Sequence, residues 1–413
     1  MTLRRTTRQL RMDRRSEPVL KEPEEAAPLT TWLNRNVAGM CLASLLSDLG
    51  HEMATAILPL FIAAIGASPA ALGIIEGASD GASTFAKVGS GRIADYKGLR
   101  HKVASLGYLI TGLATGSFAL AQSWFGLLIS RTIGWMARGA RGPCRDNLLV
   151  DSVPMTRVGT AFGFHRSADT LGAILGPLVA MFLLHRLGFR RIFLLSLLPG
   201  ALSAAAFFFL VREPPDRRRD IHPQFPGWRA AAPPTYRRFL VAVGIFGAGD
   251  FAHSMLVLRA ADLMGSTSKA MSAAIALYVV HNVTHALFSY PIGALGDRYQ
   301  RRYLLAVSYV IDTVATVGFA LGPRSLTPLV VLFVLEGIVL AAEETLESAV
   351  ATDLLPADVR GAGFGLLAGT NGVGDLVSSI VVGLLWSRVS AEAAFGYGAA
   401  MSAIGSLVLF RAI

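Results

Sequence analysis

The sequence predicts an all-α membrane protein of about twelve transmembrane helices, arranged as two six-helix halves. The first observation is compositional: of 413 residues, 53% are hydrophobic and 16% are charged. The mean hydropathy of +0.51 lies well above that of a water-soluble domain. The second observation is that the apolar residues fall into twelve long segments, and the third is that the last six repeat the first six. Lipid is therefore the expected solvent for most of the chain.

Each of the twelve segments approaches the length of about 20 apolar residues that a helix needs to cross a bilayer. In chain order they are 37–63, 69–90, 103–122, 124–142, 158–184, 192–211, 238–264, 269–293, 303–321, 327–345, 361–387 and 392–411. The expected domains are a disordered basic cytosolic tail over 1–32, an N-terminal half over 33–211, a cytosolic linker over 212–237 and a C-terminal half over 238–413.

The basic residues between the segments predict the orientation of the chain. An even number of spans puts both termini on one side, together with the Arg and Lys of the tail, 97–102, 138–157, 212–238 and 298–302. Positive loops face the cytosol, so we expect both termini there, in a multi-pass protein of the inner (plasma) membrane. Arg186, Arg190 and Arg191 fall on the other side and break the rule.

Several other classes of protein are disfavoured. A pI near 10.0 could indicate a nucleic-acid binder, but the basic residues sit between apolar runs, so no nucleic-acid partner is expected. Cys41 and Cys144 are the only cysteines, which excludes a disulfide framework and a thiolate metal cage. The glycines of 361–374 follow no phosphate-loop pattern, and no catalytic triad is recognisable. We therefore expect neither an enzyme nor a bound cofactor.

The two halves repeat each other at an offset of 202 residues, as between Gly91 and Gly293. The same offset carries Asp48 onto Asp250 and His51 onto His253. One register held across many helices indicates parallel repeats, an arrangement in which the substrate site lies between the halves near mid-membrane.

The stretch from Gly91 to Arg100 resembles the loop between helices 2 and 3 that marks the major facilitator superfamily, and 293–302 repeats it. The resemblance implies a transporter whose loop aspartates cap helices of the partner half and latch the cytosolic side. The residues assigned to this latch are Gly91, Asp95, Arg100, Gly293, Asp297 and Arg302. The second copy carries Gln300 where the family often has glycine. Arg131 matches the arginine of a further family motif on helix 4.

Ionisable side chains inside apolar helices are costly, at about 2.5 kcal/mol or more each, and so indicate function. Asp48, His51 and Glu52 share one face of helix 1, at spacings of three and four residues. Helix 7 repeats Asp250 and His253. Further candidates for the site are Arg131, Asp169 and His281.

Two interpretations of these residues remain open. They could hydrogen-bond neighbouring helices and serve packing alone. Alternatively, they could carry protons, since histidine titrates near neutral pH, or bind a metal ion through imidazole and carboxylate. Spacing does not separate proton from metal, and the metal ligands stay unknown.

A charge inversion between the halves suggests a gate. Arg141 and Arg145 on helix 4 correspond to Glu343 and Glu347 on helix 10. We expect these pairs to close the cytosolic end when the protein faces outward. The alternative is that the arginines bind lipid headgroups and pair locally with Asp146 and Asp151.

The predicted function is proton-coupled secondary transport of a small solute by alternating access, in the direction of efflux. A subgroup with a pattern similar to Asp48–Met53 is associated with magnetosomes and iron, which favours a metal ion, metalloid or metal chelate. The alternatives are a multidrug or organic-metabolite exporter, and a non-transporting receptor or scaffold with the same fold. The expected partners are a small-molecule or ion substrate, protons and membrane lipid, and the expected state is a monomer.

Overall fold

The computed structural model describes residues 32–93, 99–154, 157–213, 233–265, 267–355 and 360–412, which form helices joined by short loops and contain no strand. The N-terminal half comprises α1 (Arg35–Ala64), α2 (Pro69–Ile93), α3 (Leu99–Ser117), the short 3₁₀ helix η1 (Phe118–Leu120), α4 (Trp124–Asp151), α5 (Val158–Leu195) and α6 (Leu197–Leu210). The C-terminal half comprises α8 (Pro234–Gly247), α9 (Ser254–Leu263), α10 (Ser268–Arg298), α11 (Arg301–Leu321), α12 (Leu326–Leu354), α13 (Arg360–Arg388) and α14 (Ala391–Ala412).

All twelve predicted segments coincide with helical residues, and the all-α membrane fold is confirmed. Eight helical stretches of the described residues are long and apolar enough to cross a membrane. One of them, Ala161–Leu210, contains two of the predicted segments. The chain turns sharply between these two segments at Gly188, where φ is +72°. The count of twelve spans stays a prediction.

The predicted helix over 238–264 is not continuous, and on this point the sequence interpretation was wrong. The chain leaves the helical conformation between Gly247 and Ser254, so that α8 and α9 are separate helices. A side chain at Gly249 would lie 2.7 Å from the carbonyl oxygen of Gly398 on α14. The close approach of α14 to this position requires glycine. Asp250 lies in the break itself, and His253 is the N-cap residue of α9.

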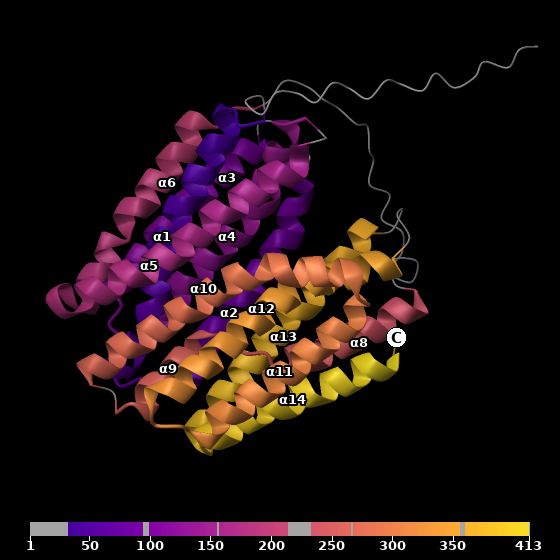
Figure 1. The fold of residues 1–413 in the computed structure, drawn as a ribbon. Coiled ribbons are helices and arrows are strands. Elements are labelled where there is room, and N and C mark those ends of the chain that lie inside the picture. Colours follow the sequence, from indigo (N-terminus) through magenta and orange to yellow (C-terminus); the bar gives the residue numbers. More distant parts are fainter. Residues whose placement is uncertain are drawn as a thin grey trace, which may run out of the picture.

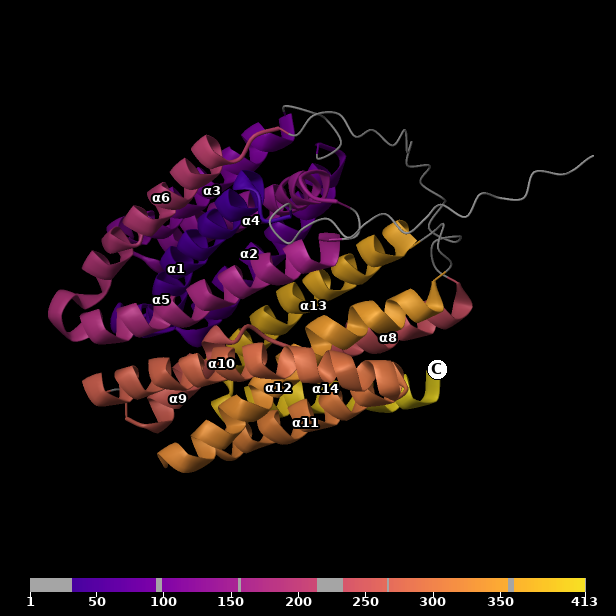
Figure 2. The same ribbon diagram turned by 45° about the horizontal axis from the view of Figure 1, so that its top comes forward.

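The two halves lie side by side and meet mainly where α2 packs on α13, α5 on α10, and α1 on α9 (Figures 1 and 2). We call the end of the bundle where α1 begins, α6 ends and α8 begins the linker end. The opposite end, where α1 turns into α2, is the far end. The sequence prediction places the linker end in the cytosol.

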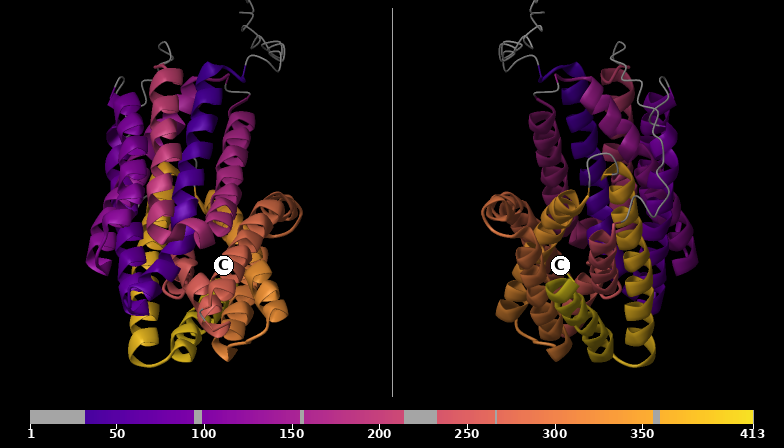
Figure 3. Two further views of the ribbon diagram at one scale, coloured as in Figure 1. Left: turned by 90° about the vertical axis from the view of Figure 1, so that its left-hand side faces the viewer. Right: turned by 90° about the vertical axis from the view of Figure 1, so that its right-hand side faces the viewer.

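The halves are packed together at the far end and separate at the linker end. One buried apolar cluster draws on both halves, with Phe61 of α1, Leu256 of α9 and Val382 of α13. Toward the linker end each half has a core of its own, around Tyr108 in one and Tyr309 in the other. Figures 1 and 3 show the halves diverging in that direction. The molecule is therefore in a conformation open at the linker end.

Candidate substrate and proton site

Asp48, predicted for the site from its place on helix 1, is held by arginine. Its carboxylate accepts two hydrogen bonds from Arg138 of α4, at 2.9 and 3.2 Å, and Arg141 Nη2 lies 3.9 Å away. A bidentate pair of this kind is strong and directional. Asp48 is also buried. It therefore joins α1 to α4 through its pair with Arg138.

His51 and Glu52 lie one turn further along α1, and only Glu52 reaches the other half. The His51 ring packs 4.3 Å from the Trp135 ring, and its Nδ1 is buried without a hydrogen-bond partner among the described residues. Tyr278 of α10 donates a hydrogen bond of 3.0 Å to Glu52 Oε2. This bond crosses between the halves.

Arg131 forms a buried ion pair inside the N-terminal half. Its Nη2 lies 2.5 Å from Glu76 Oε2 on α2, and both side chains are at most 3% exposed. Trp135, which stacks under the Arg131 guanidinium, donates to Asp80 at 2.8 Å. This arrangement favours a packing role for Glu76, Asp80 and Arg131. The predicted coupling role of Arg131 stays a prediction.

Asp169 on α5 also finds its partner within one turn of its own helix. His165 Nδ1 lies 3.4 Å from Asp169 Oδ2, and His165 Nε2 lies 2.7 Å from Ser44 Oγ. The pair thus connects α5 to α1. One Asp169 oxygen is buried without a hydrogen-bond partner in the part of the chain that the structure describes.

Asp250 lies in the break between α8 and α9, against α12 and α13. Its carboxyl lies beside that of Glu343. Its backbone carbonyl oxygen accepts from Ser378 Oγ at 2.5 Å. Two neighbouring carboxyl groups repel each other when both are ionised, and one proton between them removes that repulsion. The helix break therefore holds a carboxyl pair able to carry one proton.

His253 follows Asp250 in the same break and faces α10. Its ring centre lies 4.5 Å from that of His281, and the His281 ring in turn stacks on Tyr278. Asn282 accepts at 3.1 Å from His281 Nδ1 and donates at 3.1 Å to the carbonyl oxygen of Ala173 on α5. The predicted candidates His253 and His281 are thus brought together, and neighbours of His281 bond to the N-terminal half.

The predicted gate residues do not pair across the halves in this conformation. Arg141 packs over the Tyr108 ring at 4.0 Å and faces α3, while Arg145 Nη2 lies 2.9 Å from Asp146. Glu347 accepts from Tyr309 and from Asn371, both at 2.7 Å. Because the linker end is open here, the gate expected for the opposite conformation stays a prediction.

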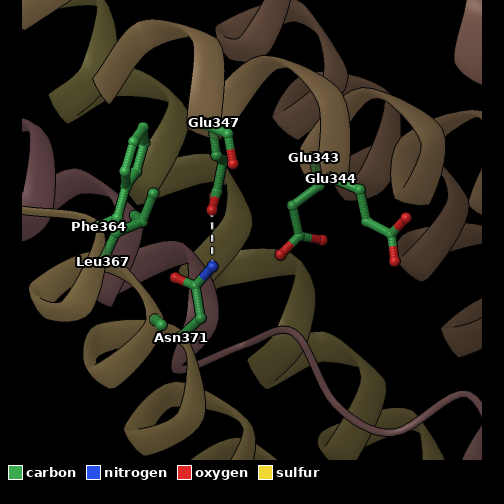
Figure 4. A pocket seen from close by; sticks show the side chains of 8 residues that line it. Glu343, Glu344, Glu347, Phe364, Leu367 and Asn371 are labelled. Atoms are coloured by element: carbon green, nitrogen blue, oxygen red, sulfur yellow. Dashed lines mark hydrogen bonds between the residues drawn. The ribbon is translucent and has the colours of Figure 1, made fainter. Parts of the chain in front are cut away.

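A cavity of about 400 Å³ opens on the C-terminal half, between α12 and α13. Glu343, Glu344 and Glu347 lie on one side of it, and Phe364 and Leu367 contribute apolar surface (Figure 4). Its walls therefore combine three carboxyl groups with aromatic and aliphatic carbon.

One cross-half contact near this cavity was missed from the sequence. Glu344 Oε2 lies 3.0 Å from Arg166 Nη2 of α5 and 3.1 Å from His285 Nε2 of α10. Another missed feature is a second pair of neighbouring carboxyls, Asp312 and Glu336, buried in the C-terminal half. Glu344 and Glu336 both lie in apolar segments. The free-energy cost of placing a charge in lipid could therefore have marked them as candidates from the sequence.

Part of the predicted latch lies outside the described residues, namely Asp95, the surroundings of Gly91 and the side chain of Asp297. Arg100 is buried within the N-terminal half, with Nη1 2.6 Å from Asp151 and Nε 2.5 Å from Glu213. Near the second copy, Arg301 Nη1 lies 2.9 Å from Asp353.

Two other latch positions of the second copy are described. Gly293 lies in α10, where a β-carbon would come within 3.3 Å of Thr345, and Arg302 Nε donates to Gln300 Oε1 at 3.1 Å. The latch stays a prediction.

The described residues contain no group of three or more His, Cys, Asp and Glu side chains arranged to hold a metal ion. The metal substrate stays a prediction.

Two helical halves that close on each other at one end, around buried charged groups, are typical of membrane transporters. Comparison with known proteins agrees. The family model described as Major Facilitator Superfamily matches residues 40–278 and 239–413. The chain belongs to the major facilitator superfamily, as its loop motifs suggested.

Among its relatives, an uncharacterized MFS-type transporter of Methanocaldococcus jannaschii, MJ1317, is 30% identical over 383 residues, which cover 91% of this chain and 94% of that protein. The quinolone resistance protein NorA of Staphylococcus aureus is 25% identical over 182 residues, 43% of this chain and 45% of NorA. A mutant of the nucleoside transporter NupG shares the fold, with a TM-score of 0.78 at 16% identity over 92% of this chain and 100% of that chain.

Proposed function

We propose that this chain is a proton-coupled secondary transporter that exports a small organic cation across the inner membrane by alternating access. The linker end is proposed to face the cytosol, as the positive loops predict. The conformation open at that end is then the one that loads substrate from the cytosol.

One observation carries the proposal: Asp250 and Glu343 are neighbouring carboxyl groups, and Glu343 lines a cavity. Such a pair can gain or lose a proton without leaving a buried guanidinium unpaired. Asp48 differs, because loss of its charge would strand Arg138. We therefore place proton exchange at Asp250 and Glu343, and assign Asp48 to holding α1 against α4.

The lining of the cavity supports an organic cation as substrate. Carboxyl groups attract positive charge, while Phe364 and Leu367 offer contact to an apolar body. A cation and a proton that compete for the same carboxyls cannot both be bound, which is the condition for exchange in opposite directions. The similarity to a quinolone resistance protein over part of the chain agrees with export.

The experiment uses the full chain in liposomes with an internal pH-sensitive dye, and tetraphenylphosphonium as the probe cation. We expect the probe to drive proton release from the wild-type protein. Asp250→Asn and Glu343→Gln should abolish it, because neither amide can take up the proton. Asp262→Asn, an exposed change on α9, is the matched control and should behave as wild type.

Failure of the wild-type protein to move protons with the probe would overturn proton-coupled export of organic cations. The same assay with Mn²⁺ or Fe²⁺ in place of the probe tests the predicted metal substrate. Proton release with the metals and none with tetraphenylphosphonium would reverse the assignment of substrate class.

A further inference from the structure

We propose that His281 and His253 form a second proton-binding site, which controls whether the two halves stay joined in the linker-open conformation. The inference rests on the proposed proton-coupled transport and adds a site separate from the Asp250–Glu343 pair. It follows from the hydrogen bonds of one amide side chain and from one buried nitrogen that has no partner.

The amide of Asn282 fixes the tautomer of His281. Its Nδ2 donates to the carbonyl oxygen of Ala173, so its Oδ1 is the atom that faces His281 Nδ1 at 3.1 Å. An amide oxygen only accepts hydrogen bonds, and therefore Nδ1 carries the hydrogen. In the neutral ring the second nitrogen, Nε2, is then a bare acceptor.

That acceptor has no hydrogen-bond partner among the described residues, although His281 is only 1% exposed. A buried polar atom left in this state costs about 1–3 kcal/mol. A proton on Nε2 would turn it into a donor. His253, whose ring centre lies 4.5 Å away, is the acceptor that we propose for it. The two imidazoles would then share one proton between their nitrogens.

The position of the pair connects this proton to the contact between the halves. Asn282, bonded to His281, donates to Ala173 of α5, and Tyr278, stacked on His281, donates to Glu52 of α1. Both acceptors belong to the N-terminal half. A positive charge on the pair is attracted to Glu52, so protonation favours the conformation seen here.

The other charged groups around the pair are few. His285 lies one turn beyond His281 on α10, and Glu344 of α12 accepts from it at 3.1 Å. Arg166 of α5 pairs with Glu344, and Arg131 of α4 stacks on Trp135 and pairs with Glu76. Glu344 is thus already matched by two partners. Glu52, unlike Glu344, accepts its described hydrogen bond from a neutral group, the hydroxyl of Tyr278.

The test measures the distance between the two halves at the linker end as a function of pH. Spin labels are attached through Lys102→Cys on α3 and Tyr303→Cys on α11, after Cys41→Ala and Cys144→Ala. We expect the long distance of the open conformation to become more populated as pH falls. His281→Gln and His253→Gln should flatten this response, whereas His101→Gln, a histidine bonded to Val211 within one half, should retain it.

A further variant guards against simple misfolding. Asn282→Asp keeps an oxygen facing His281 and adds a negative charge, which stabilises an imidazolium. The midpoint of the pH response should move to higher pH by about one unit, a tenfold change in proton affinity. An unchanged midpoint together with an unchanged response in the His281→Gln protein would overturn the proposal.

The two proposals fail separately. If His281→Gln retains both the pH response and proton release with tetraphenylphosphonium, the histidine site is wrong and proton-coupled export stands. If the wild-type protein releases no protons but its distances respond to pH through His281, the histidine site stands and the transport assignment fails.

Discussion

Buried acids of this protein have two kinds of partner. Glu76 pairs with Arg131 and Asp48 with Arg138, so each of these two carboxylates faces a guanidinium. Glu347 is instead hydrogen-bonded by Tyr309 and Asn371, which are neutral. An acid with neutral partners can exchange a proton without leaving a buried cation unpaired. An acid paired with arginine cannot, and such pairs hold helices together.

We predict that Glu76→Gln lowers the free energy of unfolding by about 3–5 kcal/mol, because it leaves the buried Arg131 guanidinium without a countercharge. Thermal unfolding in detergent measures the loss. The double variant Glu76→Leu with Arg131→Met removes both charges and should lie close to wild type. Equal destabilisation of the single and double variants would show that the ion pair is not the cause.

At the scale of elements, α2 and α13 form the closest contact between the halves, and glycine permits it. A β-carbon at Gly77 would lie 2.7 Å from the carbonyl oxygen of Leu376, and one at Gly383 would lie 2.7 Å from that of Pro69. These are backbone atoms, which cannot rotate away. The two helices can therefore slide or rock on each other only while these positions lack side chains.

For this contact we predict that Gly383→Ala destabilises the protein by about 1–3 kcal/mol, the usual cost of overpacking, and slows transport. Gly369→Ala on the same helix is the matched control, since a β-carbon there meets nothing within 4 Å. Melting temperature and the initial rate of transport are the measurements. Loss of stability in the control alone, or in both variants alike, would contradict this account of the contact.

On the scale of the whole molecule, the halves share an apolar core at the far end and separate cores at the linker end. Alternating access requires the reverse arrangement as well, with the linker end closed. Arg145 and Glu347 lie on equivalent helices of the two halves with opposite charge. We expect Arg145 and Glu347, rather than Arg141 and Glu343, to form the gate. Arg141 faces α3 instead of the other half: a β-carbon added to Gly107 of α3 would lie 2.7 Å from the β-carbon of Arg141.

For the gate we predict that Arg145→Cys with Glu347→Cys, in a protein lacking Cys41 and Cys144, forms a disulfide under conditions that close the linker end. At low pH, where the open conformation is expected to prevail, the disulfide should not form. Mobility on a non-reducing gel reports the outcome. A pair that stays unlinked in every transport condition would refute the gate.

Much of this molecule is visible in the sequence. Hydropathy located the helical segments, because a bilayer demands long apolar runs whatever their neighbours. The offset of 202 residues related Asp48 to Asp250, and the cost of charge in lipid marked both as important. The loop motif identified the family. Each of these signals is local or periodic along the chain, and so needs no knowledge of contacts.

The partners of the marked residues were decided only by the tertiary structure. Asp48 and Asp250 are equivalent in the repeat, yet one is bound by Arg138 and the other by Glu343. The break between α8 and α9, and the meeting of His253 with His281, arise where helices from different parts of the chain approach. The sequence shows which charged side chains lie in apolar segments and must therefore be shielded from lipid. The neighbour that pairs with each of these side chains depends on how the helices of the two halves pack together.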